Sequence, residues 1–142
     1  MPAKGRAQWK GDLKGGSGTF VAGDAITGDY SYKSRFEDGP GANPEQLIGA
    51  AHAACFSMAL SNILAEAGTP PDSVDTEAVV TLRPVDGAPT ITKIALTTVG
   101  RVPGIDAAGF AEHAAAAKAG CPVSRALAGV PEITLDATLA ND

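Results

Sequence analysis

The chain has few of the residue types that mark several large classes of protein. Its 142 residues include two cysteines, one tryptophan and two tyrosines, and aromatic residues make up 5% of the total. Sixteen acidic residues outnumber eleven basic ones, which gives a net charge of −5 at pH 7. Because the lysines and arginines are scattered, the sequence lacks the basic patch typical of a nucleic-acid-binding protein. We therefore expect no nucleic-acid partner.

The first residues also lack the pattern of a secretory signal. Lys4, Arg6 and Lys10 are not followed by an apolar stretch, which such a signal requires. We therefore expect a cytoplasmic protein. With 44% hydrophobic residues, residues 1–142 are long and apolar enough for a single domain with one core. Two cysteines in an intracellular protein are more often chemically active than structural.

One long segment lacks charge altogether. No Asp, Glu, Lys or Arg occurs from Gln46 to Ala65, a length that could cross a membrane. Polar residues interrupt the segment, however, and alanine fills much of the rest. A helix that is apolar on nearly every side belongs inside a protein or between subunits. We therefore expect a buried helix and no membrane partner.

The start and end of this helix are clearly marked. Asn43 has the side chain of an N-cap, Pro44 suits the first helical position, and Glu45 places an acid in the first turn. Gly68, followed by two prolines, ends the helix. The sequence therefore predicts one long helix near the middle of the chain.

The remaining segments alternate between strand and helix patterns. Segments rich in valine, isoleucine, threonine and aromatic residues, separated by glycine and proline turns, predict strands. The predicted strands are Gly5 to Leu13, Thr19 to Ala22, Ile26 to Phe36, Val74 to Leu82, Ile91 to Val99 and Ile133 to Leu139, and the further helices are Asp106 to Gly120 and Pro122 to Ala128. The order βββαββααβ predicts an α+β fold in which antiparallel sheets pack around the long central helix.

The two thiols differ in their predicted surroundings. A cysteine reacts as the thiolate, so its pKa of ~8.5 must be lowered before it reacts quickly at neutral pH. Cys121 precedes Pro122 and should cap the short helix, where the helix dipole favours negative charge. Cys55 lies in mid-helix and needs a cation from elsewhere, for which Arg35 is the nearest candidate in sequence. His52 lies three residues before Cys55, on the same helical face.

Three stretches of sequence carry a resemblance to a known family. They are SYKSRF at residues 31–36, NPEQLIGAAHAACFSMAL at 43–60 and AGCPVS at 119–124, with ITKIAL at 91–96 and EITL at 132–135 in support. Together they resemble the OsmC/Ohr family of thiol peroxidases, and the likeness spans nearly the whole chain. His52 favours the OsmC branch, because the Ohr branch tends to have an aromatic residue there.

The resemblance implies an OsmC-like intertwined homodimer that reduces organic hydroperoxides, and hydrogen peroxide less well, in the oxidative stress response. No metal, flavin or haem would be needed. By the same resemblance Cys55 is the peroxidatic cysteine, Cys121 the resolving cysteine, and Arg35 and Glu45 the charged pair that activates the thiolate. An external dithiol would restore the enzyme, and in the family this donor resembles dihydrolipoamide on a lipoylated protein.

The residue types suit this chemistry. A thiolate at Cys55 would attack the peroxide and become a sulfenic acid, with which Cys121 would condense to a disulfide. The planar guanidinium of Arg35 can stabilise the thiolate while Glu45 holds it in a bidentate pair. If Glu45 and Cys55 share one straight helix, their ten-residue separation spans ~15 Å. If both act in one site, either the helix bends or Glu45 and Cys55 come from different chains, and we predict a composite site across a two-fold interface.

Other interpretations stay open at this point. Arg35 could be a solvated residue at a strand end, and Glu45 could simply favour the helix dipole. His52 fits a buried polar group at an interface better than a catalytic base, since no orienting Asn or Asp is identifiable. The two cysteines with His52 and His113 could instead be metal ligands, although no short ligand spacing is present. A structural disulfide in a binding domain is the remaining alternative.

Overall fold

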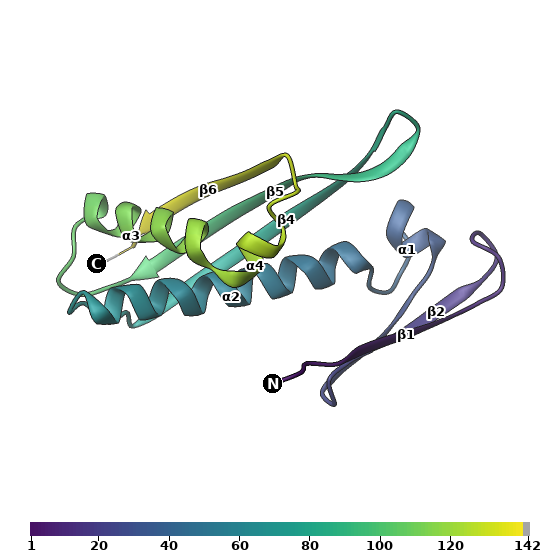
Figure 1. Ribbon diagram of the computed structural model, residues 1–142, viewed down its shortest axis with the longest axis horizontal. Coiled ribbons are helices and arrows are strands. Elements are labelled where there is room, and N and C mark those ends of the chain that lie inside the picture. The colour runs from purple at the N-terminus through teal and green to yellow at the C-terminus, as the bar shows by residue number, and fades with distance from the viewer. Residues whose placement is uncertain (141–142) are drawn as a thin grey trace. The chain divides into compact units, whose positions relative to one another are not determined.

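The computed structural model describes residues 1–140, and the chain within it divides into two compact units, Met1–Leu47 and Ile48–Asp142. Helix α2 (Pro44–Glu66) continues through the boundary between them as one element. Figure 1 shows the elements in chain order. The predicted α+β class is confirmed, and a single domain over residues 1–142 stays a prediction.

The first unit is built on an antiparallel meander. Strands β1 (Gly5–Lys10), β2 (Ser17–Ala22) and β3 (Ile26–Tyr30) pair in the order β1-β2-β3. The three strands predicted from the sequence are therefore confirmed, although β1 and β3 end earlier and β2 begins earlier than predicted. Phe20 on β2 packs near Tyr30 on β3, with ring centroids 6.2 Å apart.

The third predicted strand is wrong beyond Tyr30. Residues Tyr32–Phe36 form a short helix, α1, instead of continuing the strand. Ser31 caps it: the Ser34 amide donates to Ser31 Oγ at 3.1 Å, and the Ser31 amide donates to Ser34 Oγ at 2.8 Å. This reciprocal pair satisfies amides that a helix start leaves without partners. Arg35 therefore lies on a helix and not at the end of a strand.

The second unit contains a sheet of mixed direction. Strands β4 (Ser73–Val85) and β5 (Ala88–Arg101) form the predicted antiparallel hairpin, and β6 (Glu132–Leu139) pairs with the other side of β5. This last pairing is parallel, so the expectation of purely antiparallel sheets is wrong. Parallel neighbours need a long crossover. Helices α3 (Ala107–Gly120) and α4 (Pro122–Ala126) supply it between β5 and β6.

The core of the second unit lies between helix α2 and this sheet. Figure 1 shows α2 running beside the strands, with α3 alongside β6. Phe56, Leu60 and Leu64 are fully buried at four-residue intervals along α2, the spacing that places side chains on one helical face. The rest of the buried cluster comes from β5, α3 and the loop between them: Ile94, Leu96, Val102, Phe110, Ala114 and Ala117. This packing fixes the α2 face that also carries His52.

Helix α2 begins as the sequence predicts. The Gln46 amide donates to Asn43 Oδ1 at 2.9 Å, and Pro44 is the first helical residue. The helix is long and apolar enough to cross a membrane by length and composition alone. Most of this helix is not buried within the chain. Only 28% of its most apolar stretch is buried, and Met58 is 75% exposed.

Candidate active site

The two thiols meet in the second unit. Cys55 on α2 and Cys121, between α3 and α4, are both unbonded, and their Sγ atoms lie 3.0 Å apart. Hydrogen bonds to both α3 and α4 fix the position of Cys121. Its amide donates to Ala117 O at 2.9 Å, and its Sγ accepts from the Ser124 amide at 3.4 Å. The prediction that Cys121 caps the short helix is therefore confirmed.

The surroundings change the pKa of the two thiols in opposite directions. Burial raises the pKa of Cys55, and so does its hydrogen bond with Cys121. Burial also opposes ionisation of Cys121, but hydrogen bonds from Cys55 and Ser124 outweigh it and lower the pKa of Cys121. Because the sulfurs are in contact, they titrate as a pair. Within the pair, the surroundings therefore favour the thiolate of Cys121 over that of Cys55.

His52 is a fully buried polar residue beside this pair. Its Nε2 lies 2.7 Å from Ser124 Oγ, and its Nδ1 is a buried atom without a hydrogen-bond partner. Burial lowers the pKa of His52, which favours the neutral imidazole at neutral pH. His52 is confirmed as a buried polar group, while its place at an interface stays a prediction. Its partner Ser124 was not among the predicted site residues.

A further cation near the pair also escaped the sequence prediction. The charge of Arg125 on α4 lowers the pKa of Cys55, although burial and the Cys121 contact outweigh it. Arg125 is exposed and follows Cys121 by four residues. Residues four positions apart lie on the same side of a helix, so this spacing could have indicated that Arg125 lies near the thiols.

Arg35 and Glu45 form an ion pair within the first unit. Arg35 Nη2 lies 2.7 Å from Glu45 Oε1, and Arg35 Nε donates to both carboxylate oxygens at 3.1 and 3.3 Å. The Glu45 side chain is only 9% exposed, against 35% for Arg35. The predicted bidentate contact is therefore present. The role of the pair in catalysis stays a prediction.

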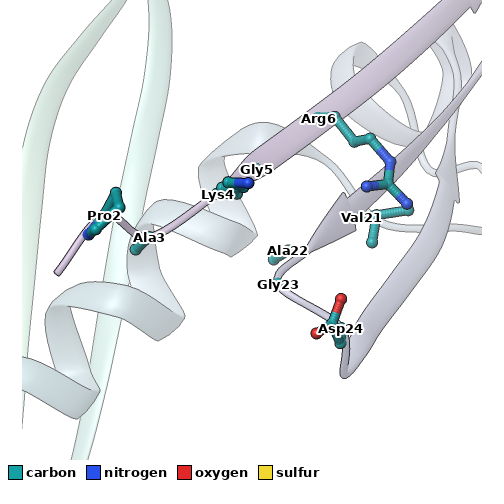
Figure 2. A pocket seen from close by; sticks show the side chains of 9 residues that line it. All are labelled: Pro2, Ala3, Lys4, Gly5, Arg6, Val21, Ala22, Gly23 and Asp24. Carbon is teal, nitrogen blue, oxygen red and sulfur yellow. The ribbon is translucent and has the colours of Figure 1, made fainter.

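The hollows in the first unit include two that bear on the predicted site residues or the chain start. One, of about 400 Å³, adjoins Arg35 and is walled mainly by aromatic and apolar residues: Trp9, Gly11, Leu13, Tyr30, Ser31, Tyr32 and Phe36. The other, of about 830 Å³, lies where β1 and β2 meet the first residues of the chain. Figure 2 shows its nine lining residues, Pro2 to Arg6 and Val21 to Asp24. None of the predicted site residues lines this larger hollow.

The metal-site alternative requires four ligands in one place. Within residues 1–140, no group of three or more histidine, cysteine, aspartate or glutamate side chains is arranged to hold a metal ion. Cys55 and Cys121 are together, and His52 contacts Ser124. His113, on α3, is half-buried and has no such grouping with them.

Comparison with known proteins gives consistent results. Residues 37–136 match the OsmC-like protein family. The chain is 54% identical over 140 residues to proteins named peroxiredoxin OsmC from Escherichia coli K12 and Shigella flexneri, covering 97% of this chain and 96% of each relative.

Solved structures share the fold. The organic hydroperoxide resistance protein OhrB of Bacillus subtilis matches with a TM-score of 0.70 and 27% identity, covering 99% of this chain and 98% of OhrB. An OsmC-like protein from Mycoplasma pneumoniae matches with a TM-score of 0.73 and 20% identity, covering 99% and 98%. The predicted OsmC-like fold is confirmed. This chain is accordingly an enzyme of the peroxidase type and belongs to the OsmC family.

Proposed function

We propose that this enzyme reduces organic hydroperoxides, and hydrogen peroxide less well, through a disulfide between Cys55 and Cys121. The observation that carries the proposal is the 3.0 Å separation of their Sγ atoms. Two free thiols in contact can exchange a proton and can bond after one is oxidised. The organic hydroperoxide resistance named for OhrB supports the substrate class.

The reaction begins at Cys55. Its thiolate donates an electron pair to the terminal peroxide oxygen, the O–O bond breaks, and the alkoxide leaves as an alcohol after taking a proton. Cys55 is then a sulfenic acid. Cys121 supplies the electron pair that forms the S–S bond, the S–O bond breaks, and the oxygen leaves as water. An external dithiol, for which a lipoylated protein is the proposed carrier, reduces the disulfide by exchange. The cycle uses no cofactor, and the cytoplasm supplies reducing conditions for it.

The Arg35–Glu45 pair supplies the charge that Cys55 needs. Burial raises the pKa of Cys55, so a nearby cation must favour its thiolate. Glu45 and Cys55 lie on one helix, ten residues and ~15 Å apart along its axis. We propose that the pair acts on Cys55 of a partner subunit, in a homodimer that also covers the exposed surface of α2. The low burial of α2 within one chain supports such an interface.

Stoichiometric peroxide tests the proposed function directly. We expect cumene hydroperoxide to remove both free thiols of the reduced protein and to produce cumyl alcohol, and a dithiol to restore both thiols. The measurement is thiol titration alongside product analysis. Boiled protein controls for direct reaction of thiols with peroxide. If both thiols survive excess hydroperoxide, the function is wrong.

A mixed dimer tests the composite site. Cys55→Ser and Arg35→Ala chains should each be inactive alone. In a mixed dimer one site would carry both changes while the other would have intact Cys55 and Arg35. Because random mixing makes half of the dimers mixed, we expect roughly a quarter of the wild-type activity after subunit exchange. Native mass spectrometry verifies that mixed dimers have formed. If they form and the activity stays at the level of the separate variants, each chain builds its own site.

A further inference from the structure

Ser124 contacts both a buried histidine and the second thiol, the first through its hydroxyl and the second through its backbone amide. His52 Nε2 lies 2.7 Å from Ser124 Oγ, and the Ser124 amide lies 3.4 Å from Cys121 Sγ. His52 is fully buried, while Ser124 is 7% exposed and Cys121 is 1% exposed. Little water reaches these groups, so their hydrogen bonds depend on one another.

The free nitrogen of His52 indicates which tautomer is present. Nδ1 is buried and has no hydrogen-bond partner among residues 1–140. A hydrogen on Nδ1 would be a buried donor with nothing to accept it, and neutral imidazole has only one ring hydrogen. That hydrogen therefore belongs on Nε2, which donates to Ser124 Oγ. The single hydroxyl hydrogen of Ser124 is then free to point at Cys121 Sγ.

We propose that His52 and Ser124 are positioning residues that direct a hydroxyl hydrogen bond onto the thiolate of Cys121. This inference deepens the proposed function and rests on it for the role of Cys121. Hydrogen bonding from the Ser124 side chain is among the influences that lower the pKa of Cys121. Cys55, itself titratable, lies against Cys121, and the charge of Arg125 acts on Cys55.

The hydrogen bond matters most after Cys55 has been oxidised. In the reduced protein, the hydrogen bond between the two thiols also lowers the pKa of Cys121. Oxidation replaces the thiol of Cys55 with a sulfenic acid and so removes that contact between thiols, whereas the Ser124 hydroxyl is unchanged and can still donate to Cys121. The Cys121 thiolate then gives its electron pair to Cys55 sulfur, the S–O bond breaks, and hydroxide leaves and takes a proton to become water. A larger thiolate fraction makes this step faster than further oxidation of Cys55.

Thiolate titration tests the inference without peroxide. In a Cys55→Ser background Cys121 is the only thiol, and its ionisation is followed by ultraviolet absorbance across pH. Adding Ser124→Ala should raise the pKa of Cys121 and reduce the thiolate fraction at neutral pH about tenfold, the order of one lost hydrogen bond to a charged group. Ser124→Thr keeps the hydroxyl and should restore the original titration.

Two further variants separate positioning from packing. His52→Gln retains an N–H donor and should leave the titration of Cys121 near the background value, whereas His52→Leu should shift it as Ser124→Ala does. Ser57→Ala is the control, because Ser57 is a half-buried serine on α2 whose hydroxyl bonds Thr76 at 2.8 Å instead of acting on Cys121. An unchanged pKa of Cys121 in the Ser124→Ala protein would overturn the inference, even if the peroxidase activity itself is verified. Since Ser124→Ala removes one atom, the test does not depend on whether His52→Leu folds.

Discussion

The Cys55→Ser protein is expected to reduce cumene hydroperoxide no faster than the uncatalysed reaction. A serine hydroxyl stays protonated at neutral pH and does not accept the terminal peroxide oxygen, so the first-turnover rate should fall on the order of a thousandfold or more. Cys121→Ser should behave differently. It should complete the first oxidation and then stop, because its Cys55 sulfenic acid has no thiol 3.0 Å away with which to condense.

Stopped-flow measurement of the first turnover distinguishes the two thiols, and mass spectrometry of the product identifies the sulfenic acid. Hydrogen peroxide in place of cumene hydroperoxide should react more slowly with the wild type. Ser57→Ala, which changes an α2 side chain that bonds Thr76 and neither thiol, should retain the wild-type rate. Equal first-turnover rates for Cys55→Ser, Cys121→Ser and the wild type would end the peroxidase mechanism proposed for this pair.

Removing the arginine of the charged pair should give the second large effect. We expect Arg35→Ala to slow the first turnover about a hundredfold, the order reported for losing one preorganised electrostatic group in an active site. Glu45 would be left with a carboxylate that is 9% exposed and has lost its bidentate partner. An unpaired buried charge is costly, so the free energy of unfolding should also fall, by about 1–3 kcal/mol because Arg35 is itself partly solvated.

An exposed ion pair supplies the matched control for Arg35→Ala. Lys93 lies 3.4 Å from Glu132, and their side chains are 44% and 51% exposed. Lys93→Ala should change the free energy of unfolding by less than about 1 kcal/mol and leave the first-turnover rate near that of the wild type. Denaturant unfolding and stopped-flow kinetics measure the two effects separately. A wild-type rate in Arg35→Ala would remove the pair from the mechanism.

The long helix and the short helix before it show what sequence could and could not predict. Asn43, Pro44 and Glu45 are a local start signal, and α2 begins where they place it. The start of α1 was missed because its capping box uses Ser34 where glutamate or glutamine is usual. The aromatic residues on either side of Ser31 also suit a strand.

The other differences between the sequence predictions and the structure arise from contacts between segments that are distant in the sequence. Alternating residues identify β6 as a strand, but its parallel pairing with β5 depends on the path of α3 and α4 between them. The His52–Ser124 contact joins residues 72 positions apart. Composition and spacing alone did not assign roles to Cys55, Cys121, Arg35 and Glu45. The family resemblance was needed to identify them as site residues. Ser124 lies outside that set because its role depends on a buried partner.

Hydrogen bonds next to the Arg35–Glu45 ion pair fix the positions of these two residues. Their side chains therefore lose conformational entropy during folding and not when substrate binds. Ser34 Oγ donates to Ala42 O at 2.7 Å, and Asn43 Nδ2 donates to Ser34 O at 2.9 Å. These bonds tie α1 to the start of α2, so Arg35 and Glu45 are ordered when the chain folds. A preorganised guanidinium needs little further ordering when a thiolate or a peroxide arrives, and a larger share of the interaction free energy is then available to stabilise the transition state.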